Sequence, residues 1–292
     1  MFAQRRRRPV PPSSTPTARK QRLGAELRKL RERAGMSSTA AANLLGGNQA
    51  RISNIEAGRY AVSADRVRVL AQNYSCSDQA LVDALAGMTG DRRRGWWEEY
   101  RETFSAGLLD LAELEHHAVA ARVAQVITIP GLLQTAEHAR AIFRDVVPPL
   151  MPPEVEHRVS YRIKRQVVLF REEPLPYTAI IHEAALRMQF GGGDTARAQL
   201  EHLITMSERD NVTLGVIPFG GVTFPISGHG VDYFHGPVAQ LDTVQLDTAH
   251  GVELVDAAAQ LEKYRLVLDR MEQAALGPGE SRDLIRRVAR EI

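Results

Sequence analysis

The side chains with the most specific chemistry in this sequence lie within residues 48–58. At 100° per residue, one side of a helix over residues 49–56 carries only small or uncharged polar side chains. They are Gln49, Ala50, Ser53 and Asn54, with Arg51 on the flank. Glutamine and asparagine form paired hydrogen bonds with adenine in the DNA major groove, alanine packs on a thymine methyl group, and arginine binds guanine or phosphate. We therefore expect this face to read base pairs; the alternative interpretation is an ordinary solvated helix face.

The residues around this face fit the spacing of a helix-turn-helix that begins at Ser38. The fifth position is Ala42, which is small enough for two helices to cross closely. The ninth is Gly46, which adopts the positive φ of a sharp turn without strain. The fifteenth and eighteenth are Ile52 and Ile55, which would hold the second helix on a core. Together these positions predict the DNA-binding motif.

Apolar periodicity and capping residues predict five short helices in residues 19–88. The first carries Leu23, Leu27 and Leu30 on one face. The other four are expected to follow Ser37, Asn48, Ser63 and Ser77. Short helices joined by tight turns make a compact all-α domain.

The run LRKLRERAGMSSTAAANLLGGNQARISNIEAGR resembles the phage repressor and Cro, or Xre-type, helix-turn-helix regulators. The resemblance implies a DNA-binding domain and pairs Glu56 with Arg31 in a structural ion pair between the first and third helices. Ser38 departs from the family, which often has a longer glutamine there that touches the DNA backbone.

Charge is distributed unevenly along the chain. Residues 1–75 hold 15 Lys and Arg against four acids, whereas residues 76–292 hold 22 against 31. A basic front next to an acidic body favours a polyanion as the partner of the front. We expect residues 1–18 to form a disordered basic arm, either with a defined minor-groove contact or as a flexible tail. The candidate phosphate contacts are Ser38, Arg28, Arg59, Arg66, Arg5, Arg6, Arg7 and Arg8.

The remaining chain predicts a linker helix over residues 89–110 and an α+β domain with a small sheet over residues 111–292. Strands are expected at 177–181, 212–217, 231–235 and 244–246. Helices are expected between them, including 108–124 and 251–276. The fold class is therefore a five-helix all-α domain followed by an α+β domain.

A second resemblance covers nearly all of residues 95–292. The segments GWWEEY, IPGLLQTAEHARA, HEAALRMQFGG and QLEHLITMSERDNVTLGVIPFGG are similar to a C-terminal domain of unknown function in actinobacterial regulators, often described as antitoxin-like. DTVQLD at 242–247 departs from that pattern, which has a tyrosine-glutamate pair nearby. The resemblance implies a transcription factor whose second domain senses or holds a ligand or a partner.

The candidate effector residues are Gln134, His182, Phe219 and Phe224. Phe219 and Phe224 belong to the long segment IPFGGVTFPISGHG, which is either a lid over a pocket or a long β-connection. An enzyme site is the competing interpretation. Its acids and histidines would come from His182, Glu183, His229, Asp232 and His235. No H-E-x-x-H, nucleophile elbow or P-loop is present, so we expect no catalytic residue, no metal and no cofactor.

The sequence thus predicts a cytoplasmic, nucleoid-associated transcriptional regulator, since no apolar run approaches the ~20 residues of a membrane span. The expected partners are double-stranded DNA with an inverted-repeat operator, a second copy in a homodimer, and a small-molecule effector. A small protein encoded by an adjacent gene is a further candidate. Two other functions stay open: an antitoxin-like protein that acts mainly on such a partner, and a DNA-tethered enzyme. Repression is the default mode.

Overall fold

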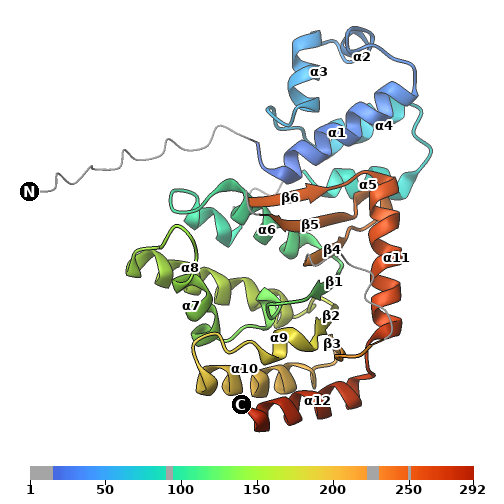
Figure 1. Cartoon of the computed structure of the whole chain (residues 1–292). Helices are drawn as coiled ribbons and strands as arrows, with labels where there is room; N and C mark the ends of the chain where they lie inside the picture. Colours follow the sequence, from blue (N-terminus) through green and yellow to red (C-terminus); the bar gives the residue numbers. More distant parts are fainter. Residues whose placement is uncertain (1–15, 90–94, 222–229, 249–250) are drawn as a thin grey trace, which may run out of the picture. The chain divides into compact units, whose positions relative to one another are not determined.

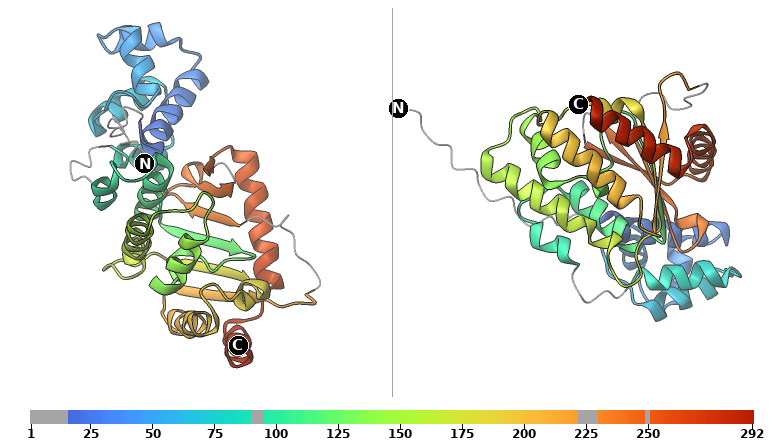
Figure 2. Two further views of the ribbon diagram at one scale, coloured as in Figure 1. Left: turned by 60° about the vertical axis from the view of Figure 1, so that its left-hand side comes forward. Right: turned by 90° about the horizontal axis from the view of Figure 1, so that it is seen from below.

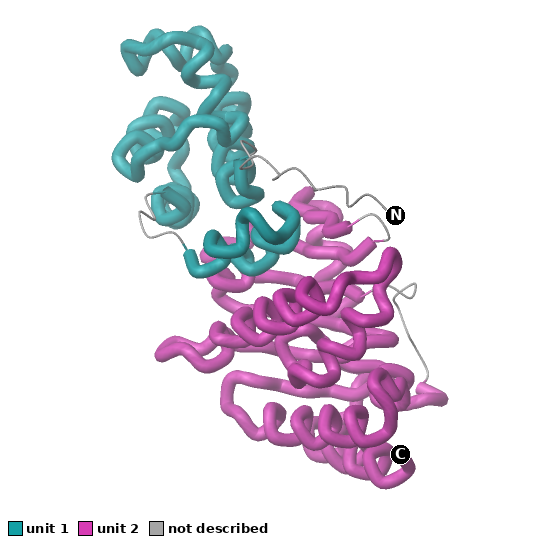
Figure 3. The backbone as a smooth tube through the Cα atoms, turned by 90° about the vertical axis from the view of Figure 1, so that its left-hand side faces the viewer, with its two compact units in different colours: residues 1–114 teal, residues 115–292 magenta. Residues whose placement is uncertain are grey.

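The computed structural model describes residues 16–89, 95–221, 230–248 and 251–292. The chain forms two compact units, residues 1–114 and 115–292 (Figure 3). Residues 1–15 of the expected arm lie outside the described residues, and so do Phe224 and His229.

Five α-helices build the first part of unit 1 (Figure 1). Their bounds are α1 Ala18–Arg33, α2 Ser38–Leu44, α3 Gln49–Glu56, α4 Ala64–Asn73 and α5 Gln79–Gly87. A side-chain oxygen caps each N-terminus by accepting a backbone N–H; the caps are Thr17, Ser37, Asn48, Ser63 and Asp78. The fifth cap is thus Asp78 and not the expected Ser77. The 3-10 helix η1 (Trp96–Tyr100) and α6 (Ala106–His117) follow.

The core of unit 1 lies where the apolar periodicity predicted it. Leu23, Leu27 and Leu30 of α1 are buried, and Val67 and Leu70 of α4 are also buried. This N-terminal all-α fold is confirmed.

Unit 2 is an α+β domain built on one six-stranded mixed sheet, in the order β3-β2-β1-β4-β5-β6. The strands are β1 Ala120–Gln125, β2 Tyr177–His182, β3 Val212–Ile217, β4 Val231–His235, β5 Thr243–Thr248 and β6 Gly251–Val255. β1, β2 and β3 are parallel, and β4, β5 and β6 are antiparallel to their neighbours. The sheet therefore changes from parallel to antiparallel pairing at β1. The expected α+β class is confirmed.

Helices cover both faces of this sheet (Figure 2). On one face lie α7 (Ala136–Arg144), α8 (Pro152–Arg165) and α10 (Gly193–Met206), and on the other lies α11 (Ala258–Ala274). α12 (Pro278–Glu291) packs against α10 and β3. The short helices are η2 Gly131–Leu133, η3 Gln166–Leu169, α9 Glu183–Arg187 and η4 Ala239–Leu241. We call the side of α7, α8 and α10 the inner face.

Two strands were not expected from the sequence. The predicted helix 108–124 ends at His117, and residues 120–125 form β1 in the middle of the sheet. The predicted helix 251–276 begins only at Ala258, because residues 251–255 form the edge strand β6. The segment AARVAQ consists largely of good helix formers, and only its pairing with β2 and β4 makes it a strand.

No helix among the described residues is long and apolar enough to cross a membrane.

Candidate nucleic-acid interface

Three residues produce the turn between α2 and α3: two helix caps and one glycine. Ser37 accepts a hydrogen bond from the Ala40 N–H and starts α2. Gly46 has a φ of +62°, and an added Cβ there would meet no atom within 4 Å, so the requirement for glycine is conformational. Asn48 then accepts from the Arg51 N–H at 2.9 Å and starts α3. A helix of eight residues is thereby presented after a sharp turn.

Apolar contacts and a close backbone approach hold the back of α3. Ile52 and Ile55 are buried, as are Ala41 and Ala42 of α2. A Cβ on Gly24 of α1 would lie 2.6 Å from the carbonyl oxygen of Ile55 and closer still to that of Glu56. The backbones of α1 and α3 therefore touch where α3 ends, and any larger residue at position 24 would push them apart.

An ion pair ties α1 to both ends of the motif. Arg31 donates from Nε and Nη2 to the two carboxylate oxygens of Glu56, at 2.6 and 2.9 Å. Its Nη1 donates to the backbone oxygen of Met36, just before α2, at 2.7 Å. Both side chains are about 9% exposed. The pair is thus well bonded and largely removed from water.

The opposite side of α3 is open to solvent. Gln49, Ala50, Arg51 and Ser53 are exposed, and Asn54 is half-buried. The Asn54 side chain has no hydrogen-bond partner among the described residues, whereas its backbone oxygen accepts from Arg59 and Tyr60. The five side chains are therefore brought together on one accessible face.

The described candidates for phosphate contact lie beside this face or on its neighbouring helices. Arg59 and Arg66 form no ion pair with any described residue, whereas Arg28 pairs with Glu32 at 2.7 Å. Ser38 and Arg28 share a cleft of about 260 Å³ with Ser53; Arg31, Glu56 and Ala57 complete its lining. The cleft thus lies where α1, α2 and α3 meet. Arg5, Arg6, Arg7 and Arg8 are outside the described residues.

The candidate effector residues of unit 2 do not form one set. The His182 ring lies 5.3 Å from that of Phe219, edge to face, and its Nδ1 accepts from the Ala184 N–H to cap α9. Gln134 is buried in a different network, in which it donates to the Ile129 oxygen and accepts from Arg162. Phe224 is not described.

The proposed acid and histidine candidates for catalysis are also separated. Asp232 and His235 are three positions apart on β4 and therefore point to opposite faces of the sheet. His235 lies 3.5 Å from Asp242, which also accepts from Tyr233. The Glu183 carboxylate accepts hydrogen bonds from the backbone N–H of Phe219 and from the Arg187 side chain. No group of three possible metal ligands occurs in the described part of the chain.

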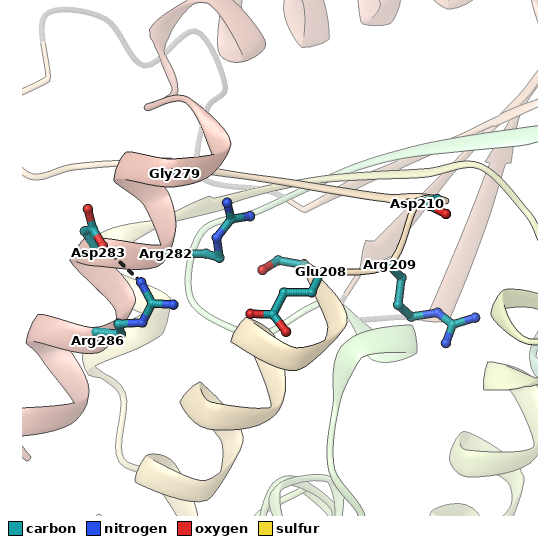
Figure 4. A pocket seen from close by; sticks show the side chains of 8 residues that line it. Glu208, Arg209, Asp210, Gly279, Arg282, Asp283 and Arg286 are labelled. Atoms are coloured by element: carbon teal, nitrogen blue, oxygen red, sulfur yellow. Dashed lines mark hydrogen bonds and ion pairs between the residues drawn. The ribbon is translucent and has the colours of Figure 1, made fainter.

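A second, more open cleft of about 730 Å³ lies between the end of α10 and the start of α12 (Figure 4). Acidic and basic side chains alternate along it. They are Glu208, Arg209, Asp210, Arg282, Asp283 and Arg286. Arg209 points away from the others, with its guanidinium 4.3 Å from the centre of the Phe170 ring. This cleft offers no surface of one charge sign to a ligand.

Sequence reasoning named Asp232 only as a candidate for an enzyme site and missed the other polar side chains on the inner face of the sheet. Arg165 of α8 donates two hydrogen bonds to Glu115 of α6, and both residues are almost fully buried. Burial lowers the pKa of Arg165, but Glu115 outweighs it and the pKa is raised. Asp232 and Arg162 lie near this pair. Their signal in the sequence was weak, because single charged residues in amphipathic segments are typical of solvated faces.

The fold and the α3 surface define the first unit as a helix-turn-helix DNA-binding domain, and residues 22–85 match the family model described as helix-turn-helix domain. The family model described as domain of unknown function (DUF5753) matches residues 108–287, and the chain belongs to this family. No curated protein and no solved structure matches the chain.

Proposed function

We propose that the protein is a sequence-specific transcriptional regulator of the Xre type, in which α3 enters the major groove. The observation that carries this proposal is the division of α3 into a buried back and an accessible front. Ile52 and Ile55 fix the helix, while Gln49 and Asn54 on its open side have the amide chemistry that pairs with adenine. Ala50 supplies the small apolar contact for a thymine methyl group, and Arg51 a flanking contact to guanine or phosphate.

Phosphate contacts would position this helix without reading sequence. The cleft shared by Ser38, Arg28 and Ser53 supports one such contact beside α2, with the serine hydroxyl in place of the longer glutamine of the Xre family. Arg59 and Arg66 supply positive charge that no described acid neutralises. The arginines of residues 5–8 would add sequence-independent attraction that weakens as salt rises.

The regulator acts as a homodimer in this proposal. One recognition helix reads only about four to six base pairs, so tight binding requires two half-sites about 34 Å apart in an inverted repeat. Unit 2 supplies dimerisation and binds an effector or a small partner protein, and it has a regulatory and not a catalytic role. Occupancy of the operator then represses transcription.

Asn54→Ala tests the readout. Loss of a paired contact with adenine should weaken binding to the preferred site by ~1–3 kcal/mol, and binding to random duplex should barely change. Fluorescence anisotropy with both duplexes, at one fixed salt concentration, measures the two affinities.

Gln72→Ala is the matched control, because Gln72 is an exposed amide on α4, outside the proposed readout face. It should change neither affinity. An equal loss on both duplexes for Asn54→Ala would reduce Asn54 to a phosphate contact and contradict its assignment to base readout.

A further inference from the structure

The inner face of the unit 2 sheet carries two opposite charges that no ion pair neutralises. Arg162 of α8 has one hydrogen bond, from Nη1 to Gln134 Oε1 at 2.6 Å, and its guanidinium lies 5.0 Å from the centre of the Phe143 ring. Asp232 of β4 has one hydrogen bond, from Gln125 Nε2 to Oδ1 at 3.1 Å. Neither forms an ion pair with any described residue.

The neighbours of these two charges are already engaged. Arg165 and Glu115 form an ion pair with two hydrogen bonds. Gln245 lies opposite Asp232 on β5, and its side chain donates to Asp247 at 2.8 Å. The surrounding structure therefore leaves both Arg162 and Asp232 without a charged partner. An unpaired charge that is partly removed from water is costly, and such charges cluster at functional sites.

The two charged side chains are partly exposed. Arg162 and Asp232 are both intermediate in burial. Among the described residues, none of the fully buried side-chain atoms without a hydrogen bond belongs to either of them. The free donors of Arg162 and the second oxygen of Asp232 are thus available to a ligand, whereas Tyr177 of β2 is only 3% exposed.

The electrostatics agree with one shared environment. Burial, together with Asp247 and Glu115, raises the pKa of Asp232 to about 7. Burial and the charge of Arg165 lower the pKa of Arg162 to about 10. Both shifts mark charges that are poorly compensated by their surroundings. The charges that act on Asp232 come from three elements besides its own, β5, α6 and α8.

The sheet brings Gln125 and Asp232 together at its centre. Gln125, whose side chain donates to Asp232, is the last residue of β1, and the strand order reverses at β1.

We propose that the inner face of the sheet binds a small zwitterion, with the anionic group of the ligand on Arg162 and its ammonium group on Asp232. Gln125, which already donates to Asp232, supplies a neutral hydrogen-bonding group beside the ligand. The inference gives a chemical class to the effector of the proposed regulator and in that sense rests on the proposed function. Binding is measured without DNA, however, so failure of one proposal leaves the other standing.

Saturation-transfer NMR on the full chain at pH 8 tests the proposal. The probes are the twenty amino acids, β-alanine, 4-aminobutyrate and glycylglycine, which span a range of charge separations. At least one should bind, and propionate and propylamine, which carry one charge each, should bind at least tenfold more weakly. Affinity should fall as the pH is lowered through 7, because protonation of Asp232 removes the partner of the ammonium group.

Arg162→Gln and Asp232→Asn should each weaken the bound probe at least tenfold. Arg122→Gln is the matched control: Arg122 lies on the opposite face, where it pairs with Asp269 and Glu272, and its loss should leave binding unchanged. Without ligand, Asp232→Asn should melt at or above the temperature of the native chain at pH 8, because it removes an unpaired carboxylate. No binding by any zwitterion, binding that survives both substitutions, or a lower melting temperature of Asp232→Asn would each overturn the proposal.

Discussion

We expect Gly24→Ala to destabilise unit 1 by about 1–2 kcal/mol and to abolish DNA binding. The new methyl group would meet the carbonyl oxygens of Ile55 and Glu56 at distances that real side chains do not adopt. Because these atoms are backbone, no rotamer change relieves the overlap, and α1 and α3 must separate. Overpacking of this kind costs about 1–3 kcal/mol or more, against a gain of up to about 1 kcal/mol in helix propensity.

Hydrogen exchange of the full chain in increasing denaturant measures this effect, with peptides from α1 and α3 as the readout. Gly87→Ala is the matched control, since it also replaces a helical glycine of unit 1 but an added Cβ meets no atom within 4 Å. It should leave stability unchanged or raise it by up to about 1 kcal/mol. Equal behaviour of the two variants would mean that α1 and α3 do not approach as closely as the structure indicates.

The second large effect is expected at the ion pair that links α1 to α3. The Glu56 side chain is about 9% exposed, and Arg31→Ala removes its bidentate partner. The same substitution removes the hydrogen-bond donor to the Met36 backbone oxygen. Breaking one side of a buried pair costs about 3 kcal/mol. Urea unfolding of the full chain, followed by exchange in the α3 peptides, measures the loss.

A double-mutant cycle separates the pair from the individual residues. The combined Arg31→Ala and Glu56→Ala variant should lose clearly less stability than the sum of the two single variants. Arg28→Ala removes an exposed ion pair with Glu32 on the same helix and should leave unit 1 nearly as stable as before. Additive losses at Arg31 and Glu56 would show that their contact contributes little.

The N-terminal part of the fold was predictable because its signals are local. Ser37, Asn48 and Ser63 cap helices from within four residues, and Gly46 marks its turn by a backbone angle that few other residues adopt. The approach of Gly24 to α3 was not predictable. It depends on a crossing between helices about 30 residues apart, and glycine in a helix has no local signature of such a contact.

Unit 2 was predictable only in class. The strand β1 resembles a helix in its own sequence, and its conformation is fixed by β2 and β4, which lie more than 50 residues further along the chain. The inner polar residues depend on this strand as well. Gln125 reaches Asp232 only because β1 and β4 pair, so the two cannot be connected while residues 120–125 are assigned to a helix. The sequence analysis named Gln134 as a candidate effector residue but did not name Arg162, which donates to it.

Selection of bound sequences from a random DNA library is the most direct test of the central claim, that α3 reads base pairs in the major groove. The purified full chain should enrich an inverted repeat whose half-sites lie about one helical turn apart. Asn54→Ala should relax the preference at one position of each half-site while other positions keep theirs. Recovery of DNA without any shared motif, or an identical motif with Asn54→Ala and Gln49→Ala, would contradict the account.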